Sequence, residues 1–182
     1  MLKSMCRFSV YAVALLCLII AGADAGQADE TPCGGGPSSF FVLGGEVQHP
    51  KTIKLEDLSS LPNQATVQDV YFGGGKMQQG EFTGVLLWDL LGSAGVTTNP
   101  NIKHDLLRKY VLVTGSNCYQ QLFSLGEIAP SIGGSHQIMV AYKENGQLLT
   151  TDGFARLVVP GDKEGARRIS NIIRIEVFGP KN

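Results

Sequence analysis

The chain has 182 residues, of which 43% are hydrophobic and 17% are charged, and its formal net charge is −1. This balance excludes the strongly basic surface that nucleic acid or an anionic membrane attracts, so we expect neither as a partner once a leader has been removed. The length suits one domain with a sizeable core.

Residues 1–25 have the features of a secretory signal peptide. Lys3 and Arg7 precede an uncharged apolar run over residues 8–22, and residues 23–25 have the small-x-small pattern that signal peptidase accepts. We predict cleavage after this triplet and a periplasmic or secreted protein that is not held by a membrane. An uncleaved anchor is the alternative, although the run is short for a membrane span.

Two cysteines, Cys33 and Cys118, remain after this cleavage. In an oxidising compartment they could form a disulfide. The alternative is two unpaired thiols, with Cys118 in the core. Cys33 lies in residues 26–39, which are rich in Gly, Ser and Pro, and we predict a flexible leader there.

The domain that we predict over residues 40–182 begins with short strands. The first, over 40–48, contains a Gly-Gly bulge, and a second follows over 52–55. Residues 55–62 predict a short helix that ends at a proline. Residues 65–72 alternate apolar and polar side chains, which indicates a half-buried strand that ends at three glycines.

The clearest helix signal covers residues 82–96. Apolar residues recur there at three- and four-residue spacing, which gives one apolar face. Thr83 is the predicted N-cap and Gly95 the predicted C-cap.

The second half of the domain predicts hairpins. Strands over 110–115 and 119–125 flank a short Ser-Asn-Cys connection, and a helical turn follows over 124–130. Strands are also expected over 138–143, 147–150, 155–159 and 172–178, with Asn145-Gly146 as a hairpin turn. The fold class is therefore α+β, a mixed and mainly β domain with one main helix and short helical turns.

Several kinds of site are disfavoured. No Gly-rich dinucleotide or P-loop motif opens a helix, no CxxC pair is present, and no serine sits in a nucleophile elbow. His49, His104 and His136 are far apart and lie beside turn residues, which indicates exposed loop histidines. We therefore predict no metal site built from them.

The loop after residue 159 is the strongest candidate site. Pro160-Gly161 turns the chain sharply, Gly165 allows a second tight turn, and backbone N–H groups in such a loop can form an anion-binding nest. Arginine side chains can fork onto phosphate or carboxylate groups. The alternative is a solvated turn, because Asp162 and Glu164 alternate with the cations. The candidate ligand-binding residues are Gly161, Lys163, Gly165, Ala166, Arg167, Arg168 and Ser170.

A family resemblance adds to this hypothesis. The stretch QIMVAYKENGQLLTTDGFARLVVPGDKEGARRISNIIRIEV, residues 137–177, resembles the molybdopterin-binding domain of the sulfite oxidase family, and GEFTGVLLWDLLGSAGV, residues 80–96, resembles the helix before it. The resemblance covers residues 40–177 and suggests a small, stand-alone, exported member. It implies a mixed α+β fold and a molybdopterin cofactor. Gly165, Ala166 and Arg167 match the loop that holds the pterin and its phosphate in that family.

The sequence also departs from the family pattern. The molybdenum-ligating cysteine of the family follows a strand that resembles residues 65–70, and the nearest positions here are Asp69 and Val70. Asp152 and Ser170 stand where the family commonly has a histidine and a lysine. A thiolate is a soft ligand that helps to fix the geometry of a metal, and a carboxylate does not replace it. Cys118, in a predicted hairpin, is a poor substitute.

Three hypotheses follow. The chain is an exported oxidoreductase that binds a molybdopterin-type cofactor, although it lacks the expected cysteine. Alternatively, it is a non-catalytic binding module of the same fold that binds a small anion or a protein partner. The third hypothesis is an interaction protein without a ligand. The first also requires a redox partner, which the sequence does not identify.

Overall fold

The computed structural model describes residues 33–133, 137–151 and 153–180. The predicted signal peptide, residues 26–32 of the leader, His136 and Asp152 lie outside these ranges. None of the helices within them has the length and hydrophobicity needed to cross a membrane.

The first sheet has five strands in the order β2-β1-β10-β5-β6. Its strands are β1 (Phe41–Gly45), β2 (Lys51–Ile53), β5 (Tyr110–Gly115), β6 (Gln120–Ser124) and β10 (Ile172–Phe178). β1 and β10 run parallel, and the other neighbours are antiparallel. The predicted strands over 110–115 and 119–125 do pair as a hairpin, which confirms that expectation.

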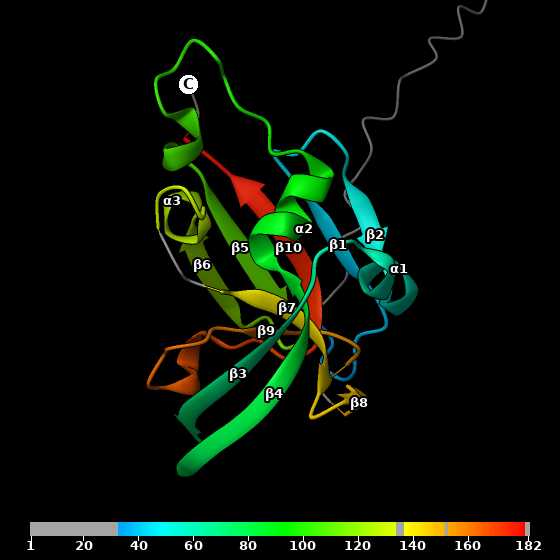
Figure 1. The fold of residues 1–182 in the computed structure, drawn as a ribbon. Coiled ribbons are helices and arrows are strands. Elements are labelled where there is room, and N and C mark those ends of the chain that lie inside the picture. Colours follow the sequence, from blue (N-terminus) through cyan, green and yellow to red (C-terminus); the bar gives the residue numbers. More distant parts are fainter. Residues whose placement is uncertain (1–32, 134–136, 152, 181–182) are drawn as a thin grey trace, which may run out of the picture. The chain divides into compact units, whose positions relative to one another are not determined.

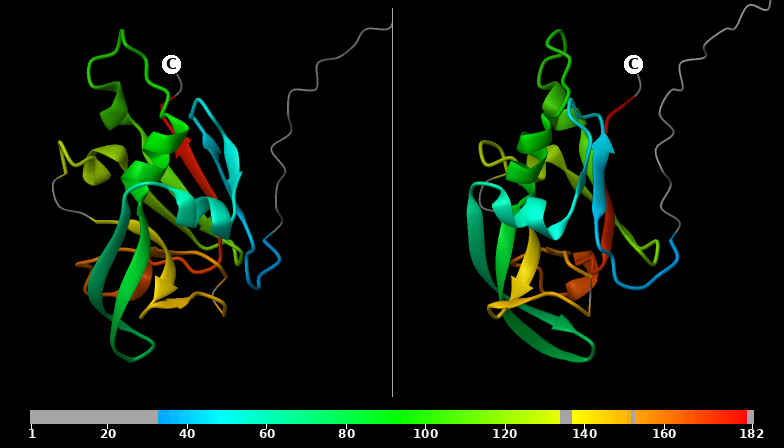
Figure 2. Two further views of the ribbon diagram at one scale, coloured as in Figure 1. Left: turned by 45° about the vertical axis from the view of Figure 1, so that its right-hand side comes forward. Right: turned by 90° about the vertical axis from the view of Figure 1, so that its right-hand side faces the viewer.

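The second sheet has the order β3-β4-β7-β8, and β9 also pairs with β7. Its strands are β3 (Gln64–Gly73), β4 (Lys76–Leu86), β7 (Met139–Glu144), β8 (Gln147–Leu148) and β9 (Arg156–Val158). The turn between β7 and β8 contains Asn145 and Gly146, both with positive φ, as the Asn-Gly pair predicts. Figures 1 and 2 show the β3–β4 hairpin extending past the end of β7.

Within the described residues, three α-helices and two 3₁₀ turns connect the strands. They are α1 (Leu55–Ser60), α2 (Leu87–Ala94), η1 (Asp105–Arg108), α3 (Leu125–Ile128) and η2 (Gly165–Arg167). Leu87, Leu90 and Leu91 of α2 join the main core, which also contains Val111 and Ile175 of the first sheet. Figure 1 shows α2 in front of β5 and β10, where it covers that face of the first sheet. The mainly β, α+β fold class is confirmed.

The predicted start of the main helix is wrong. Residues 82–86 belong to β4, where Thr83 pairs with Thr66 of β3, and the helix begins only at Leu87. After the glycine turn the chain runs back antiparallel to β3. The hydrogen bonds of this strand pairing keep residues 82–86 extended, although their apolar residues have helical spacing. Gly84 permits a close approach to β7, because a Cβ there would lie 2.1 Å from the carbonyl oxygen of Val140. Gly95 ends the helix with φ 71°, as predicted.

Cys33 and Cys118 form a disulfide, with their Cα atoms 5.3 Å apart. The alternative of two free thiols is therefore wrong for these residues. Further hydrogen bonds hold the chain beside the disulfide. The N–H of Gly35 donates to the carbonyl oxygen of Ser116 at 2.9 Å, and the Ser116 hydroxyl donates to that of Gly36 at 2.7 Å. The disulfide thus fixes the described start of the leader on the β5–β6 turn.

Candidate functional site

The predicted ligand-binding loop folds back onto the second sheet. The N–H of Phe72 in β3 donates to the carbonyl oxygen of Lys163 at 2.8 Å. Beyond the loop, the N–H of Leu157 in β9 donates to the carbonyl oxygen of Ile169 at 2.7 Å. The loop over residues 160–170 therefore leaves β9, crosses to β3 and returns to β9.

A small hydrophobic cluster underlies this loop. It is built from one face of the second sheet, and its buried members are Val67, Phe82, Met139, Ala141 and Val158. Asp69 and Tyr71 follow Val67 at two-residue spacing, so their side chains lie on the same face of β3. The loop and this sheet face together define the candidate site.

Arg168 is the loop residue that points into the sheet. The residue is 9% exposed and forms an ion pair with Asp69, which is 3% exposed. The guanidinium carbon lies 3.6 Å from the centre of the Tyr71 ring and 6.0 Å from that of Phe82. Burial of the cation lowers the pKa of Arg168 to about 10. A charge is therefore buried at the position where the resemblance expects a metal ligand.

Hydrogen bonding of Arg168 is incomplete. Its Nε and Nη1 atoms are buried, and no described residue accepts a hydrogen bond from either of them. A buried donor without an acceptor costs roughly 1–3 kcal/mol, so such donors usually have a partner. The N–H groups of these two nitrogens therefore have hydrogen-bonding capacity that the described chain does not use.

Arg167 points away from Arg168 and is satisfied within the loop and its neighbour. Its Nε and Nη2 atoms donate to the carboxylate of Asp162 at 2.9 and 2.7 Å, and Nη1 donates to Glu127 of α3 at 2.8 Å. The guanidinium also lies over the ring of Phe123, 5.2 Å from its centre. The hydrogen bonds to Asp162 and then Glu127 raise the pKa of Arg167. Its charge is thus neutralised internally, as the interleaved acidic residues suggested.

The other predicted site residues surround this pair of arginines. Gly161 has φ 89° and makes the expected tight turn, and Lys163 is exposed. Gly165 packs against Tyr71, because a Cβ there would lie 2.9 Å from that ring. The carbonyl oxygen of Ala166 accepts a hydrogen bond from the Tyr119 hydroxyl.

Ser170 accepts a hydrogen bond from Arg156, whose Nη2 lies 3.4 Å from the serine hydroxyl. Arg156 also forms an ion pair with Glu144 at 3.2 Å. The structure therefore brings the predicted loop residues together at one end of the second sheet. Sequence reasoning missed Tyr71, Glu127 and Tyr119 as their partners. For Tyr71 a signal existed, because it shares the inward periodicity of Asp69.

The residues present do not fit a thiolate-bound molybdenum. Both cysteines of the described chain are used in the disulfide. Within the described ranges, no three His, Cys, Asp or Glu side chains gather where they could hold a metal ion. Asp69, at the expected ligand position, is paired with Arg168. The groups at this place are thus one carboxylate, which could bind a metal ion, and one guanidinium, whose positive charge repels it.

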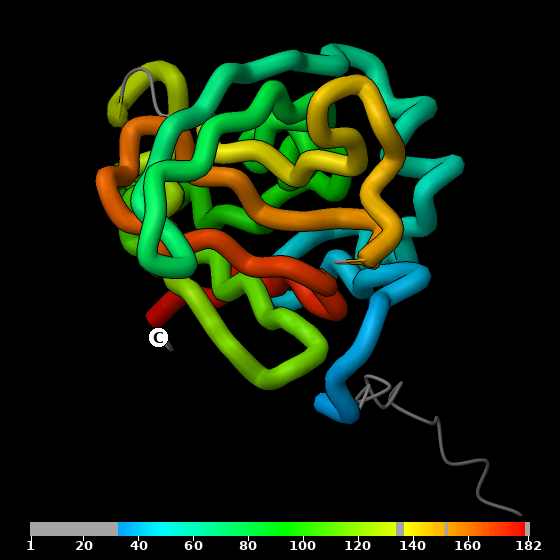
Figure 3. The backbone as a smooth tube through the Cα atoms, turned by 90° about the horizontal axis from the view of Figure 1, so that it is seen from below, coloured from blue at the N-terminus to red at the C-terminus, as the bar shows by residue number. Residues whose placement is uncertain are grey.

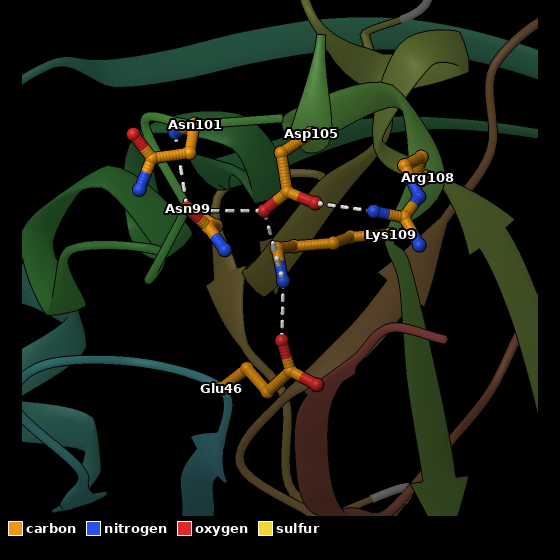
Figure 4. A network of polar contacts seen from close by, with 6 residues as sticks. All are labelled: Glu46, Asn99, Asn101, Asp105, Arg108 and Lys109. Atoms are coloured by element: carbon orange, nitrogen blue, oxygen red, sulfur yellow. Dashed lines mark hydrogen bonds and ion pairs between the residues drawn. The ribbon is translucent and has the colours of Figure 1, made fainter. Parts of the chain in front are cut away.

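A second buried charge network lies away from this loop (Figure 4). Lys109 is 7% exposed and contacts Glu46 and Asp105, with 3.6 Å between its Nζ and the Asp105 carboxylate. Asp105 also accepts a hydrogen bond from the N–H of Asn99 at 2.8 Å and contacts Arg108 at 3.3 Å. The network anchors the long segment before β5 and has the character of a structural site.

Comparisons with known proteins agree with the resemblance. Residues 39–180 match the family described as the oxidoreductase molybdopterin binding domain. No curated protein matches the sequence. Among solved structures, the fold is similar to the sulfane dehydrogenase SoxCD from Paracoccus pantotrophus, with a TM-score of 0.59 and 23% identity. The similarity covers 76% of this chain and 38% of that one, and at this identity it is a likeness of fold.

Proposed function

Since this chain belongs to the oxidoreductase molybdopterin binding domain family, we propose that it is an exported member that works as a non-redox binding module. In this proposal, the buried Arg168 receives a small oxyanion or carboxylate beneath the loop over residues 160–170. No protein thiolate holds a metal there.

The observation that carries the proposal is that Arg168 is buried and ion-paired but has unused hydrogen-bond donors. Its charge is balanced by Asp69, and its stacking on Tyr71 fixes the plane of the guanidinium. Two of its donors, Nε and Nη1, lack an acceptor among the described residues. An oxyanion would satisfy them, and charge-assisted hydrogen bonds to a fixed guanidinium are among the stronger ones in proteins. Arg167 contributes little, because Asp162 and Glu127 already occupy its donors.

Export is supported by two features. The signal-peptide pattern of residues 1–25 predicts it, and the disulfide between Cys33 and Cys118 suits an oxidising compartment such as the periplasm. We therefore propose a periplasmic or secreted location.

Family membership favours a second candidate, an oxidoreductase that binds molybdopterin. Gly165, Ala166 and Arg167 would be the residues that hold the pterin and its phosphate, and the cofactor would supply the redox chemistry. Arg167 would then have to exchange its bonds to Asp162 and Glu127 for bonds to the phosphate. The geometry favours the non-redox binding module, because both the arginine and the metal-ligand position are already engaged.

A thermal shift experiment tests the binding module. The exported protein, with its disulfide formed, is heated in phosphate, in sulfate and in chloride of matched ionic strength. We expect phosphate or sulfate to raise the melting temperature, because a ligand at a hundred times its Kd stabilises the folded state by about 2.7 kcal/mol.

Two variants locate the effect. Asp69→Leu together with Arg168→Met removes the donors without leaving a buried charge unpaired, and this variant should show no anion-dependent rise. Arg167→Ala is the matched control, since its side chain is held by Asp162 and Glu127, and it should keep the rise. An equal rise in the double variant, or none in the natural protein, would contradict the proposed site.

A further inference from the structure

β3 forms a long, open edge of the second sheet. It has ten residues and stands last in the strand order, and its strand ladder runs only to β4, from Gln64 to Gly73. Figure 3 shows the strand running along the outer side of the domain. The loop over residues 160–170 meets only its end, at Phe72.

The backbone groups that this edge presents can be assigned from one hydrogen bond. The N–H of Phe72 points away from β4, because it donates to the carbonyl oxygen of Lys163. Alternate residues of a strand direct their N–H and C=O groups to the same side. The backbone N–H and C=O groups of Thr66, Gln68 and Val70 therefore also point away from β4, and within the described residues no backbone hydrogen bond reaches these groups.

This edge lacks the usual protection against pairing. Natural edge strands are short or carry lysine, proline or inward charges. The other outermost strands are shorter than β3, since β2 has three residues and begins with Lys51, β8 has two residues, and β6 has five. β3 contains no lysine, arginine or proline, and the inward charge of its one charged residue, Asp69, is neutralised by Arg168. An edge of this length without protection indicates a binding partner.

We propose that the partner is a second copy of this chain, whose β3 pairs with this β3 in antiparallel orientation about a two-fold axis at Val67. This register places Thr66 opposite the partner's Gln68 and Gln64 opposite the partner's Val70, which are the pairs whose backbone groups face each other. These residues are uncharged, so no like charges meet across the axis. The contact also covers part of Val70, which is 50% exposed.

This arrangement uses the same edge of both chains and therefore closes as a dimer. It leaves the loop over residues 160–170 on β9 and Arg168 on the inner face of the sheet, so it does not depend on the proposed anion site. The dimer and the anion-binding function can thus fail separately.

Sedimentation velocity of the exported protein, from low to high micromolar concentration, tests the proposal. We expect a concentration-dependent equilibrium between monomer and dimer. Gln68→Pro removes one N–H from the open edge without touching the ladder to β4, and it should leave only monomer. Thr66→Lys with Gln68→Lys should also leave monomer, because it places like charges opposite each other across the axis.

A matched variant makes the register itself testable. Thr66→Glu with Gln68→Lys places opposite charges across the axis, so this pair of substitutions should keep the dimer that the two lysines abolish. Far-UV circular dichroism and thermal unfolding establish whether each variant is folded. If Gln68→Pro does not fold, the two charge variants test the proposal. A monomer at every concentration, open polymers, or a dimer that survives the two lysines would overturn the proposal. A natural protein that stays monomeric and pairs through β3 only with another protein would also overturn it.

Discussion

Replacing Arg168 with methionine should destabilise the protein strongly. The substitution keeps a long side chain beneath the loop but leaves the carboxylate of Asp69, 3% exposed, without its cation. Removing one partner of a buried pair costs about 3–5 kcal/mol. We take the lower end, since the pair lies under a single loop. Loss of the guanidinium stacked 3.6 Å above Tyr71 adds about 1 kcal/mol. The expected loss in the free energy of unfolding is therefore about 4 kcal/mol.

The double variant separates the pair from the packing. Asp69→Leu with Arg168→Met replaces both charges by apolar groups, and such replacements are often close to neutral, so we expect it within about 1 kcal/mol of the natural protein. Urea unfolding, followed by the fluorescence of the single tryptophan, Trp88, gives both free energies. If Arg168→Met cost less than about 1 kcal/mol, the pair would behave as an exposed one, and the reasoning would be refuted. A double variant as unstable as the single one would refute it too.

Three further predictions use the same unfolding assay. Cys33→Ser with Cys118→Ser opens a loop with a sequence separation of 85 residues, and should lower the free energy of unfolding by about 4 kcal/mol on the chain-entropy estimate; an unchanged value would mean that the bond does not form. Gly84→Ala places a Cβ 2.1 Å from the carbonyl oxygen of Val140 and should lower the free energy of unfolding by at least about 1–3 kcal/mol. In Gly92→Ala the added Cβ meets no neighbouring atom within 4 Å, so this variant should stabilise α2 by about 0.5–1 kcal/mol. Equal effects of the two substitutions would contradict the ladder between β4 and β7. The N–H of Asn99, followed by Lys109 and Arg108, lowers the pKa of Asp105 below 3.8, so the stabilisation that its carboxylate gives is present above that pH and is lost as pH falls through the folded-state pKa. Asp105→Asn should therefore reduce the free energy of unfolding at neutral pH and make it fall less steeply on acidification; an unchanged acid dependence would argue against this role.

The hairpins over 110–125 and 138–150 were predictable because their signals are local, and Asn145 and Gly146 tolerate the positive φ that such a turn needs. Residues 65–72 alternate with the period of a strand, so β3 also follows from the sequence. Its hairpin with β4 was missed, because no strand was predicted over 76–86. The boundary between β4 and α2 was not predictable, because the spacing of apolar residues over 82–96 also suits a helix. Only the pairing of β4 with β3 and β7, a non-local interaction, decides where the helix begins.

The candidate site shows a similar division. The sequence identifies the loop, because glycines and consecutive arginines after a strand are visible in the chain. It does not say which way each arginine points. Asp69 precedes Arg168 by about a hundred residues, and Glu127 precedes Arg167 by 40. Only the fold brings the carboxylates to the loop, where they decide that one arginine is buried and the other neutralised near the surface.

The central claim is that the Asp69–Arg168 pair occupies the position where the family resemblance expects a thiolate ligand. Molybdenum, tungsten and pterin analysis of the protein purified after export tests this claim most directly. Our account predicts metal and pterin far below one per chain. One molybdenum or tungsten with one pterin per chain, lost together when the loop residue Arg167 is replaced by alanine, would contradict it.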